Sequence, residues 1–102
     1  MPILIYTTAG SLKEAENIAK NLVEKRLVAC VNYFPIKSVY WWKGKACCEK
    51  EYVLLCKTVE SRFTEVKEAI KKFHSYEVPA VFSIKIGEGE SKYFQWIQDS
   101  VE

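Results

Sequence analysis

Residues 28–58, VACVNYFPIKSVYWWKGKACCEKEYVLLCKT, decide the fold of this 102-residue chain. They are the longest run of residues that favour β structure, and the motif WKGK in their middle is typical of a hairpin turn in which Gly44 adopts a positive φ. We therefore expect two long antiparallel strands, at residues 28–42 and about 47–58. Pro35 has no N–H to donate to a neighbouring strand, which predicts an edge position, a bend or a bulge at that point.

A strand and a helix are predicted before the hairpin. Residues 2–8 form an apolar, β-rich run that ends near Gly10. Ser11 and Glu14 make a capping box, a pattern that starts helices. The helix should continue to about Arg26, because apolar residues recur at helical spacing and form one buried stripe. The members of this stripe are Leu12, Ala15, Ile18, Ala19, Leu22 and Val23.

Two helices and one strand are predicted after the hairpin. A helix that begins at Ser61 has to end before Pro79, because the residue before a proline avoids helical backbone angles. Residues 80–86 predict a fourth strand, and a last helix follows the loop that starts at Gly87. The expected buried stripe of the earlier helix is Phe63, Val66, Ile70 and Phe73, and the apolar positions of the last helix are Tyr93, Phe94, Trp96, Ile97 and Val101.

The element order is β-α-β-β-α-β plus a C-terminal helix, which predicts a ferredoxin-like α+β fold with one antiparallel sheet. Residues 1–102 have the size of a single domain and contain no repeat or linker. Both helices of the βαββαβ unit cover one face of the sheet, so the other face needs a partner. Trp41 and Trp42 point to opposite faces, because neighbours in a strand alternate, and at least one should meet another subunit. The alternative is that the last helix, with Trp96, folds back over the hairpin.

Composition narrows the classes of partner. The 15 Lys and Arg residues and 13 Asp and Glu residues are mixed along the chain, with a net charge of +2, so nothing demands a nucleic acid. No stretch approaches the ~20 apolar residues that cross a bilayer, and the first residues do not resemble a signal peptide. Cys30, Cys47, Cys48 and Cys56 lack the spacing of a disulfide scaffold. We expect a reduced, cytoplasmic protein without membrane contact.

Two other functions that use this element order are not supported by the residues. An RNA-recognition domain needs an aromatic residue after the glycine of its signature, and residues 43–47, KGKAC, have none. An acylphosphatase-like enzyme needs an arginine-bearing anion loop after the first strand, and residues 8–11, TAGS, carry no arginine. The single GxG, at residues 87–89, is acidic and lacks the third glycine of a dinucleotide site.

Short segments along nearly the whole chain carry a family resemblance. They are Tyr6-Thr7-Thr8, Ala29-Cys30-Val31-Asn32, the run from Ser38 to Gly44, Glu49-Lys50-Glu51, Lys57-Thr58, the run from His74 to Pro79, and the helix from Tyr93 to Trp96. In order and spacing they resemble the signature segments of the CutA divalent-cation-tolerance family. The main departure is Ser75, where the family usually has proline after the histidine.

The resemblance implies a homotrimer of ferredoxin-like protomers whose hairpins pack between subunits, with a shape similar to the PII signalling trimers. It also implies a role in tolerance to divalent cations, copper especially, without catalytic activity and without an obligatory cofactor. Residues of these segments would line a cleft between subunits. They are Asn32, Tyr40, Trp42, Glu49, Glu51, Lys57, Thr58 and Tyr76.

A metal site is the sharpest chemical hypothesis. His74, the only histidine, lies close in sequence to Tyr76 and Glu77, and imidazole and carboxylate groups suit copper or zinc. Cys30 joins this hypothesis because it belongs to a family segment. The alternative is a structural His74 in the last turn of a helix, where it interacts well with the helix dipole, and cysteines that pack as small apolar residues.

The remaining polar residues leave two further interpretations open. Glu49 and Glu51 face the same way on a strand and could pair with Lys57 or with a neighbouring subunit. A PII-like sensor would bind a small anionic metabolite between subunits, where Lys57, Thr58, His74 and Tyr76 might converge. Cys47 and Cys48 are adjacent on a strand, so they cannot both bind one ion without distortion.

Overall fold

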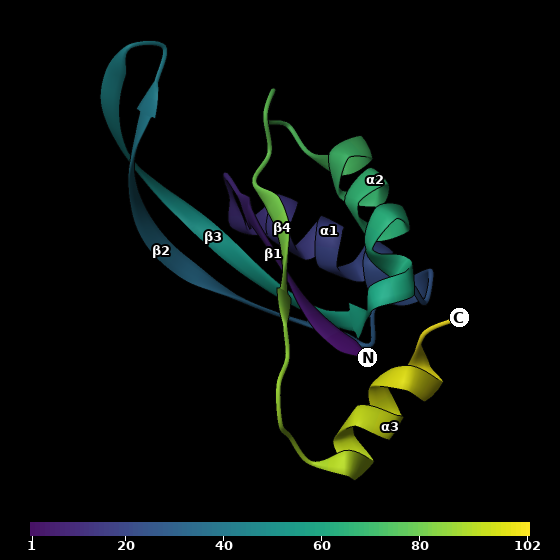
Figure 1. The fold of residues 1–102 in the computed structure, drawn as a ribbon. Coiled ribbons are helices and arrows are strands. Elements are labelled where there is room, and N and C mark those ends of the chain that lie inside the picture. The colour runs from purple at the N-terminus through teal and green to yellow at the C-terminus, as the bar shows by residue number, and fades with distance from the viewer.

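A computed structural model describes all residues of the chain, 1–102. It contains a four-stranded sheet, three α-helices and one 3-10 turn at Glu60–Arg62 (Figure 1). In chain order the elements are β1 (Pro2–Ala9), α1 (Leu12–Glu24), β2 (Cys30–Trp42), β3 (Lys45–Val59), α2 (Phe63–Phe73), β4 (Val81–Lys85) and α3 (Ser91–Ser100).

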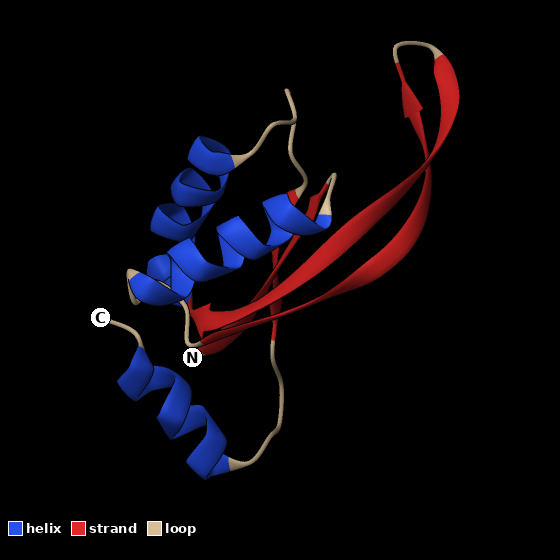
Figure 2. Ribbon diagram, turned by 180° about the vertical axis from the view of Figure 1, so that it is seen from behind, coloured by secondary structure: helices blue, strands red, loops and turns tan.

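The sheet has the strand order β2-β3-β1-β4, and every neighbouring pair is antiparallel. Helices α1 and α2 lie side by side on one face of it (Figure 2). This arrangement is the ferredoxin-like fold and confirms the fold class expected from the sequence. None of the helices is both long and apolar enough to cross a membrane.

The β2–β3 hairpin has an unbroken register from the pair Cys30–Lys57 to the pair Trp42–Lys45. Its two-residue turn has φ values of 50° at Lys43 and 79° at Gly44, as a type I′ turn requires, which confirms the turn expected at Gly44. Pro35 pairs opposite Tyr52 without a bulge, and β2 is the edge strand of the sheet. Of the expected explanations for Pro35, the edge position therefore applies.

The core lies between the sheet and α1 and α2. Alternate residues of β1 and β3 point into it, as the period of a strand dictates, and the helices contribute their apolar stripes. Its buried residues are Ile3, Ile5, Ala9, Ala15, Ile18, Ala19, Leu22, Val28, Leu54, Cys56, Val66 and Ile70. The two expected helical stripes are thus correct in their centres and wrong at their ends, because Leu12, Val23 and Phe73 are exposed.

Helix α1 ends at Glu24, two residues before the expected end at about Arg26, and Arg26 itself adopts a left-handed φ of 57° that turns the chain. The N–H groups of Arg26 and Leu27 bond to carbonyls of the last turn of α1, the pattern of a Schellman cap. The Arg26 guanidinium donates to the carbonyls of Ser100 and Asp99 at the C-terminus of α3. Arg26 therefore links the ends of α1 and α3.

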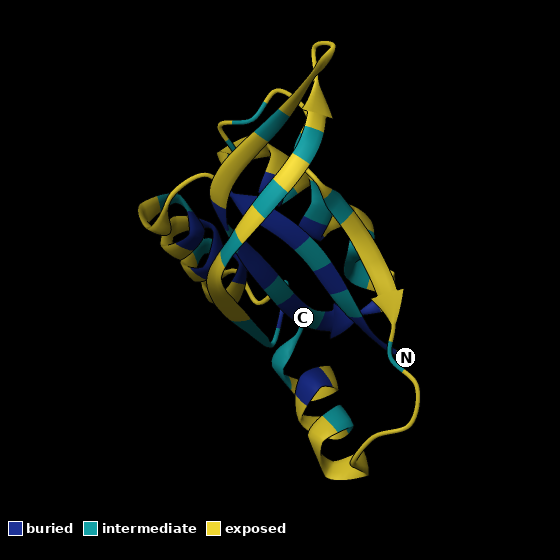
Figure 3. Cartoon of the chain, turned by 90° about the vertical axis from the view of Figure 1, so that its left-hand side faces the viewer, coloured by how far each residue is buried: buried dark blue, intermediate teal, exposed yellow.

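The face of the sheet opposite α1 and α2 is largely uncovered. Tyr6 and Phe82 stack on it with ring centroids 4.8 Å apart, and Phe34, Phe82 and Ile84 are exposed. Figure 3 shows buried residues at the centre of the sheet and exposed ones along the far part of the hairpin. Helix α3 contacts β1 and β3 through the buried Ile97, but it lies at the opposite end of the molecule from the hairpin turn (Figure 1).

The alternative in which α3 covers the hairpin is therefore wrong for the single chain. Trp41 is 77% exposed and Trp42 is 39% exposed. Trp96 stacks on Tyr93 of its own helix, with ring centroids 5.6 Å apart, and both rings remain exposed. The expectation that another subunit meets one of the hairpin tryptophans stays a prediction.

Candidate functional site

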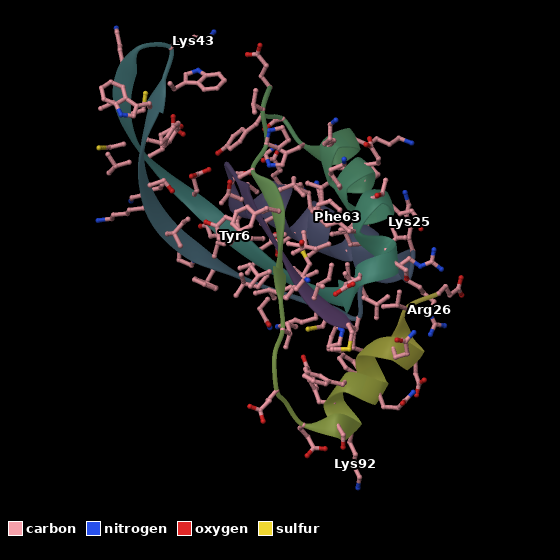
Figure 4. All side chains as sticks on the ribbon, in the orientation of Figure 1. Tyr6, Lys25, Arg26, Lys43, Phe63 and Lys92 are labelled. Carbon is pink, nitrogen blue, oxygen red and sulfur yellow. The ribbon has the colours of Figure 1, made fainter.

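A pocket of about 440 Å³ lies between the hairpin and the segment that joins α2 to β4. It opens beside Tyr6 of β1, which Figure 4 shows between the hairpin and β4. The lining side chains are mainly aromatic or aliphatic. They are Tyr6, Thr8, Ser38, Val39, Tyr40, Trp42, Glu51, Tyr76, Val78 and Ala80.

Glu51 is the only charged residue that lines this pocket, and it is 6% exposed. One of its oxygens, Oε2, accepts a 2.8 Å hydrogen bond from the Tyr76 hydroxyl. Burial, followed by the interaction with Glu51, raises the pKa of Tyr76 well above its ordinary value. The phenol therefore stays protonated and donates to Glu51 over the whole physiological pH range.

His74 is held by backbone groups on both sides of its ring. Nδ1 accepts a 3.0 Å hydrogen bond from the Tyr76 N–H. Nδ1 is then the acceptor nitrogen, so Nε2 carries the proton and donates to the carbonyl of Thr8. A metal ion binds a histidine through one of its two ring nitrogens, and both nitrogens of His74 already form hydrogen bonds within the chain. This geometry supports the structural interpretation of His74, in which the ring fixes the α2–β4 segment against the end of β1.

Glu14 anchors the same segment from α1. Its Oε1 accepts from the Gly10 N–H at 3.0 Å, and its Oε2 accepts from the Ser75 N–H at 2.9 Å. Burial acts to raise the pKa of Glu14, but the hydrogen bonds from Ser75 and Gly10 outweigh it, and the pKa lies below its ordinary value. A proline at position 75, as is usual in the resembling family, would have no N–H to make the second bond. Ser75 therefore lacks the rigidity of a proline but donates a charge-assisted hydrogen bond from its N–H to the Glu14 carboxylate.

A second hollow of about 200 Å³ adjoins the pocket. It shares Tyr40, Trp42 and Tyr76 with the pocket and adds two carboxylates, Glu49 and Glu77. Partial burial, and then the neighbouring Glu49, raise the pKa of Tyr40. The two hollows together expose carboxylates and aromatic rings, and no lysine or arginine lines either of them.

The structure divides the residues expected at a cleft into two groups. Tyr40, Trp42, Glu49, Glu51 and Tyr76 lie together around the two hollows. The other members of the set lie further along the strands: Asn32 pairs opposite Leu55, and Lys57 pairs opposite Cys30.

Thr58 also lies away from the hollows. Its hydroxyl donates a 2.7 Å hydrogen bond to the carbonyl of Leu27. The hydroxyl therefore stabilises the loop after α1 and is not free to bind a ligand. Within one chain Lys57 and Thr58 do not converge with His74 and Tyr76.

The three residues of the metal hypothesis are not assembled within one chain. Glu77 lies at the second hollow, His74 is turned toward Thr8, and Cys30 sits at the other end of the hairpin opposite Lys57. No group of three His, Cys, Asp or Glu side chains is placed to hold a metal ion.

The cysteines are all free thiols. Cys47 pairs opposite Tyr40 and Cys48 opposite Val39, so the two side chains point to opposite faces of the hairpin. Cys56 is buried in the core, and burial raises the pKa of its thiol to about 12. A thiol that is buried and protonated is a small apolar side chain, as its apolar strand context suggested.

Sequence analysis did not assign the strand β1 side of the pocket or the role of Glu14. Tyr6 and Thr8 belong to a family segment and alternate on one face of β1, which could have pointed to them. Val78 and Ala80 flank Pro79 in an extended segment, so as alternate residues they point to the same side. The capping box predicts that Glu14 bonds to the backbone at the start of α1, and Glu14 does so at the Gly10 N–H. Its bond to Ser75 joins residues 61 positions apart and leaves no local pattern.

Comparison with known proteins gives a consistent set of similarities. The family described as CutA1 divalent ion tolerance protein matches residues 3–100. The divalent-cation tolerance protein CutA of Archaeoglobus fulgidus is 48% identical over 98 residues, which covers 96% of this chain and 96% of that protein. The protein of the same name from Thermotoga maritima is 41% identical over 99 residues, or 97% of this chain and 98% of that one.

The solved structure of the periplasmic divalent cation tolerance protein CutA from Archaeoglobus fulgidus has the same fold as this chain. It matches with a TM-score of 0.98 at 47% sequence identity, and the match covers 100% of both chains.

Proposed function

Because the chain belongs to the family of CutA1 divalent ion tolerance proteins, we propose that it supports tolerance to divalent cations, copper in particular, by binding metal ions as a homotrimer. The observation that carries the role in tolerance is the match to this family over residues 3–100, which includes every strand and helix of the fold apart from the first residue of β1. The homotrimer and the metal ion rest on further observations.

The homotrimer is supported by the apolar surface that one chain leaves open. We call the exposed residues Phe34, Phe82 and Ile84 of the open sheet face, together with Val39 and Trp41 of the hairpin tip, the assembly surface. Each large apolar side chain that leaves water stabilises an assembly by about 1.5–3 kcal/mol. Long hairpins that project from ferredoxin-like protomers and pack between them would give a PII-like trimer.

The metal site has to be shared between copies of the chain. One chain offers no group of three suitable ligands, and His74 could coordinate only after it releases Thr8 or Tyr76. Of the other two expected ligands, Cys30 interacts with the Tyr93 hydroxyl, and the Glu77 carboxylate makes no hydrogen bond or salt bridge in the chain. An interface between copies can place residue i of one copy against residue j of another, so Cys30 of one chain and Glu77 of a neighbouring chain could meet there. Copper and zinc both accept this ligand set.

We place binding, not catalysis, at the centre of the function, with no obligatory cofactor. The tyrosine and the carboxylate nearest each other, Tyr76 and Glu51, are joined by a hydrogen bond, and burial keeps the phenol protonated. The alternative of a PII-like sensor for an anionic metabolite is disfavoured in one chain, because Glu49, Glu51 and Glu77 surround the hollows while Lys57 lies apart from them.

Calorimetry on the purified assembly tests the metal proposal. We expect saturable binding of Cu(II) and Zn(II), a loss of affinity in Cys30→Ser and Glu77→Gln, and no loss in Glu68→Gln, a surface carboxylate of α2. Nucleotides serve as the anionic ligands in the same experiment. Binding of a nucleotide without binding of either metal ion would replace this proposal with the sensor.

The cytoplasm is the proposed compartment. Four free cysteines with no disulfide suit a reducing environment. The related protein from Archaeoglobus fulgidus is described as periplasmic, so the question is open to experiment. Fractionation of cells that express the chain should recover it with cytoplasmic markers, and recovery with periplasmic markers would contradict the proposal.

A further inference from the structure

The 440 Å³ pocket combines aromatic walls with a single buried carboxylate. Four rings line it, those of Tyr6, Tyr40, Trp42 and Tyr76. The face of an aromatic ring carries negative electrostatic potential and attracts cations, and the effect is largest for tryptophan. The remaining walls are apolar, so a ligand here has to tolerate the loss of its hydration shell.

The carboxylate of Glu51 is only partly satisfied by the protein. Oε2 accepts from Tyr76, whereas Oε1 has no hydrogen-bond partner in the protein, and no lysine or arginine forms a salt bridge with Glu51. Glu51 is 6% exposed, and Oε1 is not among the fully buried atoms, so the carboxylate is largely but not wholly removed from water and gains from a nearby positive charge. Glu49 and Glu77 add negative charge at the adjoining hollow. The pocket therefore favours a positive ligand and disfavours an anion.

A bare divalent ion does not fit the same walls. Hard divalent ions take about six or more oxygen ligands, and copper or zinc takes several nitrogen, sulfur or oxygen ligands. The pocket offers one carboxylate, the hydroxyls of Thr8 and Ser38, and the phenol groups of three tyrosines, one of which is bonded to Glu51, and it has no imidazole or thiol. An organic ammonium ion needs fewer polar ligands, and its carbon groups pack against the apolar walls.

The protein already places an ammonium group on one of the rings. Lys43 Nζ lies 5.8 Å from the centroid of the Trp42 ring, within the range of a cation–π contact. Lys43 is at the tip of the hairpin (Figure 4), in a turn position, and its long side chain can move. The contact shows that the Trp42 ring is accessible to a cation.

From this combination we propose that the pocket binds a small organic cation, an amine or quaternary ammonium compound, with its positive charge against Trp42 and Glu51. The volume lies in the range typical of small-molecule sites. The proposal goes beyond tolerance to divalent metal ions, because it needs neither a metal ion nor Cys30 and Glu77.

The test compares choline with its neutral isostere 3,3-dimethylbutan-1-ol, by calorimetry on the full assembled protein. The two molecules share shape and hydroxyl group and differ in charge. We expect saturable binding of choline and an affinity for the isostere that is at least about tenfold lower, because the isostere loses the cation–π and carboxylate attractions. Equal affinities, or no saturable binding of choline, would overturn the proposal.

Substitutions locate the site. Trp42→Leu removes the ring and keeps an apolar wall, and Glu51→Gln removes the charge and keeps an acceptor for Tyr76. Each should weaken choline binding about fivefold or more, whereas Trp96→Leu, on α3 away from the pocket, should leave it unchanged. An unchanged affinity in both pocket variants would place the choline elsewhere and contradict the proposal.

Two further measurements keep the test independent of variant folding and of the metal proposal. In the unmodified protein, nuclear Overhauser effects should connect the choline methyl protons to the rings of Trp42 and Tyr76, and their absence from a saturated sample would also count against the site. Cys30→Ser, which removes a proposed metal ligand at the other end of the hairpin, should bind choline with unchanged affinity. A loss of choline binding in this variant would contradict the proposal.

Discussion

The two parts of the β2–β3 hairpin both contain apolar, β-favouring residues but lie in opposite environments. The base is the part of β3 from Tyr52 to Val59, which pairs with β1 on one side and β2 on the other. The tip, residues 36–51, extends beyond the end of β1 and pairs only with itself. In the base, Leu54 is fully buried at 0% exposure, whereas in the tip Val39 and Trp41 are 74% and 77% exposed.

This difference shows that β propensity alone does not say which surface a strand will meet. Both parts contain aromatic residues and valine, which favour strands, but only the base contributes side chains to the core that α1 and α2 cover. The base stabilises the protomer. The tip, which holds Tyr40, Trp42 and Glu49 at the hollows and Trp41 on the assembly surface, presents groups for other molecules.

Replacing a base residue should have the largest effect on the stability of the chain. Leu54→Ala removes a fully buried side chain from the core and should lower the free energy of unfolding by about 2–5 kcal/mol. Guanidinium denaturation at one fixed protein concentration measures the change, since unfolding of an oligomer depends on concentration. Leu55→Ala, a half-buried neighbour on the other face, is the matched control and should cost less. A reversed order would mean that the base is not the stabilising part.

Replacing a tip residue should affect assembly and leave the protomer folded. Trp41→Asp puts a charge on the assembly surface, while the exposed ring contributes within about 0.5 kcal/mol to the protomer itself. We expect a smaller assembly at micromolar concentration, together with an unchanged circular dichroism spectrum. Trp41→Phe keeps an apolar ring and should assemble normally. Loss of the folded spectrum in Trp41→Asp would assign the tip to the protomer.

The sequence was sufficient for the fold because the deciding signals are local. The turn at Gly44, the cap at Ser11 and the stop before Pro79 set the order of elements, and strand alternation placed Trp41 and Trp42 on opposite faces. The ends of the helical stripes were less predictable. Leu12 and Val23 have the right spacing for burial, but both side chains are exposed, so they lie outside the core that covers the middle of α1.

The candidate site was predictable only in part. The tip residues and Tyr76 came from the family segments, and the structure brings them together. The engagement of both nitrogens of His74, and of Glu14 with Ser75, could not be inferred, because these bonds join α1, β1 and the α2–β4 segment across the fold. Lys57 lies far from Tyr76 in space. Tyr76 contacts Glu51, Lys57 is six residues further along β3, and a strand rises about 3.3 Å per residue.

A third prediction concerns Arg26, which links the ends of α1 and α3 beside the base of the hairpin. Arg26→Ala removes the guanidinium bonds to Ser100 and Asp99 and should lower the free energy of unfolding by about 1 kcal/mol. Hydrogen exchange should accelerate in α3 and stay unchanged in the tip. Arg26→Gly loses the same bonds, but glycine adopts the left-handed backbone without strain. It should therefore lower the free energy of unfolding less than Arg26→Ala does. Equal exchange in α3 of both variants and the unmodified protein would exclude this role of Arg26.

The smallest expected effect is the pH response of the segment that closes the pocket under the tip. The pKa of Glu14 is lowered in the folded protein, so its contribution is present above its ordinary value of 4.5 and is lost as the pH falls through the lowered pKa. Solvent exposure limits the effect to less than about 1 kcal/mol. Urea unfolding from neutral to acidic pH should show this loss in the unmodified protein and not in Glu14→Gln. The same slope in both would assign the loss to other groups.

The subunit number tests most directly whether the tip and the open sheet face meet sister chains. Light scattering of the purified protein at micromolar concentration, with and without Cu(II), gives the mass of the assembly. We predict three times the mass of one chain in both conditions. A stable, soluble species with the mass of a single chain would contradict the account, because Trp41 and the open face would then have no partner.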